Sequence, residues 1–203
     1  MKNVFLGLVA VLGSCVIASG AMAQEAPEWV RIRSITYAGS GCQAGTVAQN
    51  VAPDRLAFTL LFDSYIAEVG PHISLANSRR NCQINIDLDY PSGWTYTVYS
   101  VDYRGFAKLD PGVNAIQKAS YYFQGGSGPS KETRFYGPLE KDYRLRDTFG
   151  NETWSQCRSV RSLNINTQVR LENRFAPHNS GLITVDSIDG QVIQTYGFVW
   201  RRC

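Results

Sequence analysis

Residue types on which many hydrolases and metal proteins depend are scarce in this sequence. The 203 residues contain only two histidines, His72 and His178. A Ser–His–Asp or Cys–His hydrolase needs a histidine base beside its nucleophile. The sequence contains no G-x-S-x-G segment, which would present a nucleophilic serine. There is also no C-x-x-C pair and no H-x-x-x-H spacing. The sequence therefore predicts neither a catalytic triad, nor a zinc knuckle, nor a thioredoxin-like site.

An excess of charge of one sign is also missing. The chain has 20 Lys and Arg against 17 Asp and Glu. A nucleic-acid partner would require a clear basic excess, so we expect none. The longest apolar run lies within the first 23 residues, where Gly and Ser interrupt it, and it is too short for a membrane-spanning helix. We therefore expect no transmembrane segment.

The first 23 residues have the layout of a secretory signal peptide. Lys2 is followed by an apolar run and then by Ala21-Met22-Ala23, which predicts cleavage after Ala23. An alternative is that Leu12-Gly13-Ser14-Cys15 is a lipoprotein processing site, which would make Cys15 a lipidated N-terminus. We favour cleavage after Ala23 because the A-x-A site is complete. The expected product is secreted, extracellular or periplasmic, with a single all-β domain over residues 24–203.

Four cysteines remain once Cys15 leaves with the signal peptide: Cys42, Cys82, Cys157 and Cys203. An even number of cysteines in an exported protein predicts disulfides, here two. Three pairings are open. We prefer Cys42–Cys82 and Cys157–Cys203, because each bridge then closes a loop within its own half of the chain. Loops of roughly forty residues correspond to about 4 kcal/mol of stabilisation each in the chain-entropy model.

Apolar and polar residues alternate with a period of two, as in strands with one dry and one wet face. The apolar members of three such runs are Leu56, Phe58, Leu60 and Phe62; Ile84, Ile86, Leu88 and Tyr90; and Leu163, Ile165, Thr167, Val169 and Leu171. Turn signals separate the runs, and Asp189-Gly190 predicts a hairpin. No long window keeps a helical period. The sequence thus predicts an all-β fold, an antiparallel β-sandwich or jelly-roll-like domain, with a long loop at 125–138.

The stretch YAGSGCQAGTVA, residues 37–48, places Gly39, Gly41 and Gly45 around Cys42. A phosphate-binding glycine loop needs a helix to follow it, so that backbone N–H groups point at the anion. The segment that follows is rich in valine and contains Pro53, which prevents a continuous helix. We therefore interpret the glycines as tight bends around a disulfide anchor.

Seven sequence blocks follow one another in an order that resembles an exported family known as domain of unknown function 4360. They are GSGCQAGTV, LLFDSYIAEVGP, RRNCQINIDLDYPSGW, VDYRGFAKLDPGV, SYYFQG, WSQC and FVWRRC. The resemblance runs from about Ile35 to Cys203. It implies a secreted, cysteine-containing all-β domain in which the four cysteines are structural. It implies no reaction, because the family is uncharacterised.

Aromatic residues are concentrated in two of the predicted strands. By strand alternation, Trp94 and Tyr96 share one face, whereas Tyr99 and Tyr103 share the other. One face must belong to the core, so at least half of these rings are packing residues. An exposed set would form a platform able to stack on sugar rings or on a protein partner. The candidate binding surface is Tyr96, Tyr99, Tyr103 and Tyr121.

These observations favour a secreted, non-enzymatic β-sandwich that binds a glycan or an extracellular protein, or that helps to build an extracellular layer. One alternative is a hydrolase or calcium-assisted enzyme, since loop carboxylates are suitable ligands for Ca²⁺ and can act in pairs. Its candidate residues are Asp63, Asp102, Asp110, Asp186 and Asp189. Another alternative is an inhibitor of secreted enzymes, with 125–138 as its inhibitory loop. No catalytic residue, and no cofactor other than calcium, is predicted.

Overall fold

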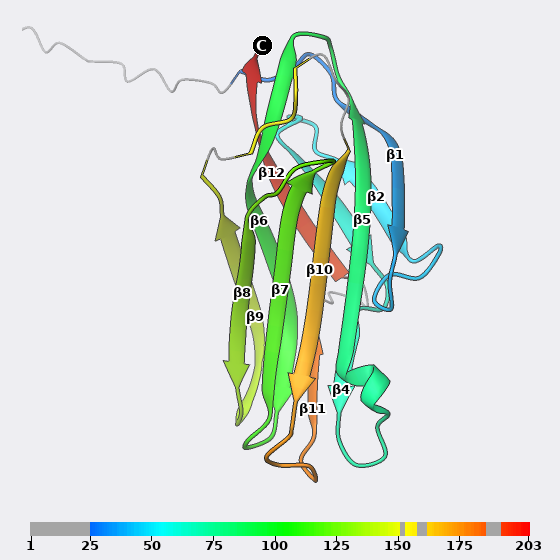
Figure 1. Cartoon of the computed structure of the whole chain (residues 1–203), viewed down its shortest axis with the longest axis vertical. Helices are drawn as coiled ribbons and strands as arrows, with labels where there is room; N and C mark the ends of the chain where they lie inside the picture. The colour runs from blue at the N-terminus through cyan, green and yellow to red at the C-terminus, as the bar shows by residue number, and fades with distance from the viewer. Residues whose placement is uncertain (1–24, 151–152, 158–161, 186–191) are drawn as a thin grey trace, which may run out of the picture.

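The computed structural model describes residues 25–150, 153–157, 162–185 and 192–203. Two antiparallel sheets pack face to face along the length of the molecule (Figure 1). The first sheet forms the front layer and has the order β1-β5-β10-β7-β8. Its strands are β1 (Arg31–Ala38), β5 (Arg79–Asp89), β10 (Leu163–Glu172), β7 (Asn114–Phe123) and β8 (Ser130–Tyr136). The predicted antiparallel β-sandwich is confirmed.

The second sheet is organised around the long strand β6 (Trp94–Leu109). One edge of β6 pairs with β9, and the opposite edge pairs first with β12 and then with β11. The remaining strands extend the sheet on either side. The bounds are β2 (Val47–Val51), β3 (Ala57–Phe62), β4 (Ile66–Val69), β9 (Leu139–Thr148), β11 (Gly181–Thr184) and β12 (Val192–Arg202).

The hairpin predicted at Asp189-Gly190 lies outside the described residues. On either side of it, β11 and β12 do not pair with each other but lie end to end along β6. The long loop predicted at 125–138 is wrong, because β8 occupies most of this segment and pairs with β7. β8 is an edge strand whose residues are mostly polar and exposed, which weakens its alternation. A 3-10 turn spans Leu75–Ser78, and no helix in the described chain has the length and apolarity of a membrane span.

The core lies between the two sheets and contains the residues predicted from alternation. The buried residues include the five apolar-face residues of β10 together with Phe58, Leu60, Phe62, Ile84, Ile86 and Leu88. Leu56 is partly buried and packs against this core. Aromatic rings join the layers at the upper end. Tyr96 of the second sheet has its ring centroid 5.2 Å from that of Phe123 in the first sheet and 5.1 Å from that of Trp200.

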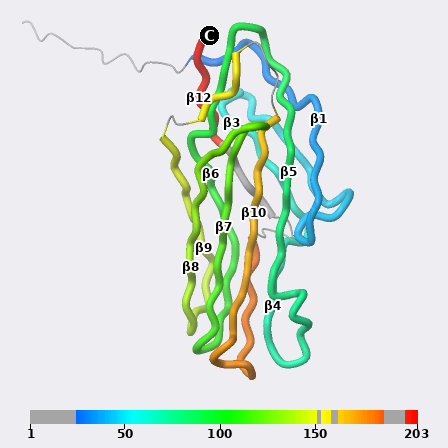
Figure 2. The backbone as a smooth tube through the Cα atoms, in the orientation of Figure 1, coloured from blue at the N-terminus to red at the C-terminus, as the bar shows by residue number. Residues whose placement is uncertain are grey.

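Both preferred disulfides are present. Cys42 and Cys82, with Cα atoms 5.5 Å apart, join the loop after β1 to the middle of the first sheet. Cys157 and Cys203, with Cα atoms 5.9 Å apart, tie the segment before β10 to the C-terminus at the upper end of the molecule (Figure 2). Next to this second bridge, the guanidinium of Arg201 lies 3.9 Å from the ring centroid of Trp154. The bridges therefore fix two segments that strand pairing alone would leave loose.

Two of the glycines around Cys42 allow other atoms to approach the backbone closely. A Cβ atom on Gly39 would lie 2.1 Å from the carbonyl oxygen of Asn81, and one on Gly41 would lie 2.5 Å from ring carbons of Tyr65. Gly45 has a φ of +82°, which favours glycine, and its N–H donates to the Tyr37 hydroxyl. The interpretation of this stretch as a tight bend around a disulfide is consistent with these contacts.

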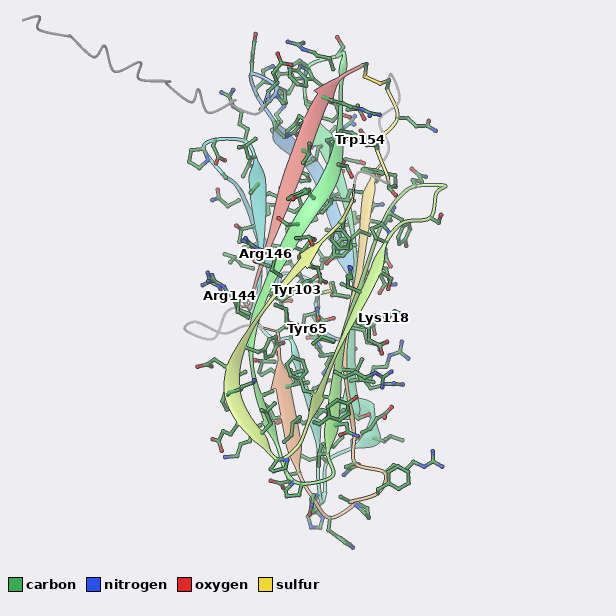
Figure 3. The ribbon with its side chains drawn as sticks, turned by 90° about the vertical axis from the view of Figure 1, so that its left-hand side faces the viewer. Tyr65, Tyr103, Lys118, Arg144, Arg146 and Trp154 are labelled. Atoms are coloured by element: carbon green, nitrogen blue, oxygen red, sulfur yellow. A yellow bond between two sulfur atoms is a disulfide. The ribbon has the colours of Figure 1, made fainter. Side chains whose placement is uncertain are left out.

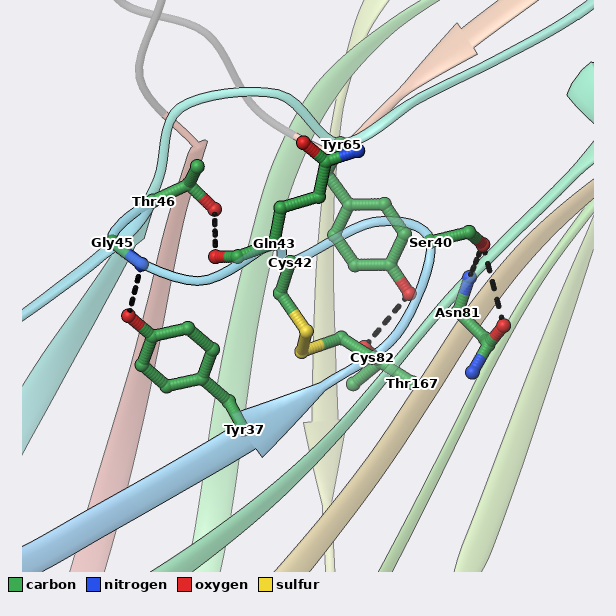
Figure 4. Close-up of a disulfide and its surroundings, with 10 residues drawn as sticks. All are labelled: Tyr37, Ser40, Cys42, Gln43, Gly45, Thr46, Tyr65, Asn81, Cys82 and Thr167. Carbon is green, nitrogen blue, oxygen red and sulfur yellow. Dashed lines mark hydrogen bonds between the residues drawn. A yellow bond between two sulfur atoms is a disulfide. The ribbon is translucent and has the colours of Figure 1, made fainter.

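Tyr65, fully buried under this loop, connects the two sheets. Its hydroxyl is 2.9 Å from the Thr167 hydroxyl of β10 (Figure 4). Its backbone carbonyl accepts a hydrogen bond from the N–H of Val185, just after β11. Desolvation raises the pKa of the Tyr65 phenol well above its ordinary value, and burial does the same to the pKa of Tyr96.

Replacing Gly41 by alanine tests the packing of the loop on Tyr65. We expect Gly41→Ala to lower the free energy of unfolding by about 2–3 kcal/mol, because the new methyl group overlaps a buried ring that has no room to move. Gly126→Ala is the matched control, since its Cβ would lie 3.4 Å from the nearest atom, and it should change stability by less than about 0.5 kcal/mol. Urea unfolding measures both; equal effects would contradict the packing argument.

Alkaline pH should destabilise the fold through its buried phenols. The unfolded chain ionises its tyrosines near the ordinary pKa of 10.0, whereas folded Tyr65 and Tyr96 keep their protons. Their contribution is therefore complete below pH 10 and is lost as the pH rises, by about 1.4 kcal/mol per pH unit for each residue. Tyr65→Phe should reduce this slope in urea unfolding curves measured above pH 10. Tyr136→Phe, at an exposed position, should not; an unchanged slope in Tyr65→Phe would refute the assignment.

Candidate functional site

The predicted aromatic surface does not form, because three of its four members belong to the core. Tyr96, Tyr103 and Tyr121 are 1%, 0% and 2% exposed, whereas Tyr99 is 50% exposed. The structure therefore separates the four residues instead of bringing them together on one outer face. In Figure 3 the labelled Tyr103 and Tyr65 lie between the two sheets. Their aromatic area stabilises the fold and is not available to a ligand.

A β-bulge explains why strand alternation failed here. Gly197 of β12 is opposite Ser100, while the next residue, Phe198, is opposite Val98, so Tyr99 has no partner on β12. Because of this extra residue, the large side chains of β6 that face the core have even residue numbers before the bulge and odd residue numbers after it. Tyr96 before the bulge and Tyr103 after it are consequently both buried, and Tyr99 projects to solvent.

Those acidic residues considered for calcium or hydrolysis that the structure describes, Asp63, Asp102 and Asp110, do not form a cluster. Asp102 lies within β6 and forms two hydrogen bonds of 2.7 Å with Arg146 of β9. Asp110 accepts a hydrogen bond from the backbone N–H of Ser180, and Asp63 is exposed after β3. Asp186 and Asp189 lie outside the described residues. In the part of the chain that is described, no three His, Cys, Asp or Glu side chains are placed to hold a metal ion.

Four loops come together at the lower end of the sandwich in Figure 1. They are residues 70–78 between β4 and β5, 110–113 between β6 and β7, 137–138 between β8 and β9, and 173–180 between β10 and β11. We call this region, with the strand ends that border it, the loop end. It is the end of the molecule opposite the C-terminus (Figure 2).

Hydrogen bonds hold these loops against one another. Asp110 and Ser180 exchange two of them, since the Asp110 N–H donates to the Ser180 carbonyl at 3.0 Å and the Ser180 N–H donates to the Asp110 carboxylate at 2.8 Å. The Asn179 amide donates to the Pro111 carbonyl at 2.8 Å. The N–H of Gly137 donates to the Val113 carbonyl at 2.8 Å. These hydrogen bonds hold the loops of the loop end in a defined arrangement.

Large apolar side chains project from these same loops. Leu75 is 85% exposed and Phe175 is 89% exposed, and they are accompanied by Tyr136 at 63% and Ile73 at 40%. Four of the seven large apolar residues that are exposed in the described chain thus belong to the loop end. Each such side chain costs free energy in contact with water, so their collection on one end needs an explanation other than folding.

Two grooves open at the loop end, and of these four side chains Ile73 lines one of them. One, of about 280 Å³, lies over β4 and β11; the other, of about 330 Å³, lies between the 110–113 and 137–138 loops. The first is lined by Glu68, Val69, Pro71, Ile73, Lys108, Asp110, Ser180, Gly181 and Leu182. Lys108 and Asp110 line both, and the Lys108 amine is 3.0 Å from the Glu140 carboxylate. The walls are apolar with a few charged groups, as in protein and ligand contact sites.

The period-two pattern did not predict the loop end, because its residues lie outside the strands. A usable signal is present in HISLANS and RFAPHNSG, where Leu75 and Phe175 occur inside turn-rich segments that are otherwise polar. Both histidines of the chain, His72 and His178, are exposed in these loops. Only the fold shows that the two segments are neighbours, since about a hundred residues separate them in the sequence.

The chain is similar to an uncharacterized secreted protein from Arthroderma benhamiae, with 42% identity over 181 residues that cover 87% of this chain and 73% of the relative. Among solved structures, it was compared with the enzymatically active domain of tailspike protein 4 from bacteriophage CBA120. That comparison has a TM-score of 0.26 and 16% identity, and covers 83% of this chain but only 19% of the tailspike chain, so it supports no argument. A family model described as Domain of unknown function (DUF4360) matches residues 28–203, and the protein therefore belongs to that family.

Proposed function

We propose that the protein is an exported, non-enzymatic binding module that holds an extracellular protein partner at its loop end. The observation that carries this proposal is the exposure of Leu75 and Phe175 on loops that hydrogen bonds hold in place. Exposed apolar side chains that cluster on a soluble domain are typical of surfaces that contact another protein. Because the loops are already ordered, binding would cost little conformational entropy.

The composition of the loop end resembles that of a protein interface. Its apolar centre comprises Leu75, Phe175, Tyr136 and Ile73. Charged groups are also present at the loop end, including the Lys108–Glu140 ion pair and Arg174, whose guanidinium lies 5.6 Å from the Phe175 ring centroid. A desolvated aromatic and aliphatic centre with a polar rim is the usual arrangement at protein–protein contacts.

Export is supported by two independent features. The first is the signal-peptide layout of residues 1–23, and the second is the pair of disulfides, which persist in oxidising compartments. The Arthroderma relative is itself described as a secreted protein. These features favour an extracellular or periplasmic location for the mature domain.

A hydrolase is the second candidate, and one observation favours it. Glu68 and Asp110 line the same groove, as two carboxylates would in an acid–base enzyme. However, Asp110 already accepts a hydrogen bond from Ser180, and Lys108 is paired with Glu140. Asp110 thus has a structural role in holding the loops, and we place binding before hydrolysis. The inhibitor hypothesis loses its proposed loop, since 130–136 is the strand β8.

A double substitution at the loop end tests the proposed function. Leu75→Ser together with Phe175→Ser should leave stability nearly unchanged, since both residues are exposed, but should weaken partner binding about 30-fold, as for loss of a hot spot of about 2 kcal/mol. The measurement is quantitative affinity capture from the culture medium of the producing organism, followed by Kd determination with the captured protein. Tyr99→Ser, at an exposed aromatic position on β6, is the control and should bind like the parent.

Two results would refute this assignment. One is a captured protein that the double variant binds as tightly as the parent does. The other is turnover of a secreted protein or polysaccharide substrate that Glu68→Gln abolishes and that the Leu75/Phe175 double variant retains. The second result would move the protein to the hydrolase class.

A further inference from the structure

The outer face of the first sheet carries a block of side-chain amides on its two central strands. The block consists of Asn81, Gln83 and Asn85 on β5 and of Gln168, Asn166 and Asn164 on β10. The register places Asn81 opposite Gln168, Gln83 opposite Asn166, and Asn85 opposite Asn164. Three successive cross-strand pairs on this face are therefore amide opposite amide. We call these six residues the amide block.

Folding stability does not explain this composition. Asparagine is depleted in strands, where β-branched and aromatic residues pack best. The inner faces of β5 and β10 follow that preference with Ile84, Ile86, Ile165 and Val169. A solvated outer face made of Thr, Lys and Glu would keep the same alternation with better strand propensity. Four asparagines on two interior strands therefore indicate a role other than holding the sheet together.

Several amides of the block are oriented by neighbours, while others are free. The Asn85 amide donates to the side-chain oxygen of Asn164 at 3.0 Å, and the Gln83 amide donates to the Tyr122 hydroxyl at 3.3 Å. By contrast, the side chains of Asn166 and Gln168 form no hydrogen bond with any residue that the structure describes. Each of these two offers two N–H donors and one carbonyl acceptor to solvent.

The face carries almost no net charge, which restricts the ligand. The block itself is uncharged. Charged residues of both signs border it. At one end Arg79 of β5 is opposite Arg170 of β10, which is 2.9 Å from Glu172. At the other end Asp87 and Asp89 follow on β5, and Asp89 is 2.8 Å from Arg31. On β7, Lys118 is opposite Glu132 of β8. Figure 3 shows Lys118 on one side of the sandwich and Arg144 and Arg146 on the other. The bordering charges are of both signs and nearly balance, so the face does not favour a polymer of one charge sign, and the block itself offers no apolar surface to an apolar partner.

We propose that the amide block binds a neutral polysaccharide. An uncharged sugar chain presents hydroxyl groups that donate and accept hydrogen bonds, and an amide can match both roles with one side chain. Neighbouring strands repeat about every 4.8 Å and same-face residues about every 6.8 Å along a strand, so the six amides form a regular, nearly flat array. Such an array suits an extended, repeating ligand better than a small molecule, which would need a concave pocket.

The test uses a charge-introducing, nearly isosteric pair of substitutions in the exported protein. Asn166→Asp with Gln168→Glu removes N–H donors and adds two negative charges on the face. The matched control is Gln49→Glu with Asn50→Asp, which makes the same chemical change at two exposed positions of β2 in the other sheet. The probes are insoluble cellulose, chitin and β-1,3-glucan, and the measurement is the amount of protein that sediments with each over a range of concentrations.

We expect the parent and the β2 control to bind at least one of these polysaccharides, and the amide-block variant to bind it about tenfold or more weakly, as for loss of one or more hydrogen bonds. Binding should change little between low and high salt, because no ion pair is involved. The Leu75→Ser/Phe175→Ser variant should bind the polysaccharide like the parent, which separates this site from the loop end.

Three outcomes would overturn the proposal. The first is that the parent binds none of the three polysaccharides. The second is equal binding by the parent and the amide-block variant. The third is a parent that self-associates in sedimentation velocity through this face, with the amide-block variant monomeric and the polysaccharides without effect. That result would make the block a contact between two copies of the chain, since amide-rich faces also stack on one another.

Discussion

The buried hydrogen bond between Tyr65 and Thr167 is the contact on which the arrangement of the two sheets depends. Tyr65 comes from the second sheet, between β3 and β4, and Thr167 from the middle of β10 in the first. Gly41 lies directly on the Tyr65 ring, and the adjacent Cys42 is tied to Cys82. A covalent bridge, an aromatic ring and a polar bond thus meet in one fully buried place. Breaking the polar bond alone would leave a hydroxyl without a partner in the core, which is costly.

β10 connects this contact to both proposed binding surfaces, the amide block and the loop end. Because Thr167 points inward, its neighbours Asn166 and Gln168 must point outward, and a slip of one residue would exchange the two faces. The same strand ends at Glu172 and leads directly into the 173–180 loop that carries Phe175. The buried face of β10 therefore fixes which amides reach solvent and where the loop end begins.

The parts of the fold that could be predicted are those in which the residue pattern of one strand is enough to show which of its side chains are buried. The inward-facing residues of β3, β5 and β10 follow from alternation alone. The disulfide pairing follows from the expectation that each bridge closes a loop within its own half of the chain. β8 was missed because an edge strand needs few apolar residues. The position of Tyr103 was missed because the bulge at Tyr99 is visible only against Gly197 and Phe198 of another strand. The loop end depends on which distant turns become neighbours, and that information belongs to the topology.

The two surfaces differ so much in chemistry that one ligand could not satisfy both. The loop end is apolar with a charged rim, and burying it requires a partner that excludes water. The amide block is uncharged and polar, and its contacts are made hydrogen bond by hydrogen bond. They lie on different parts of one sandwich, the block on the outer face of the first sheet and the loop end beyond the lower strand ends (Figure 1). Occupying one surface leaves the other open, so the proposed polysaccharide on the sheet and the proposed protein on the loops do not exclude each other.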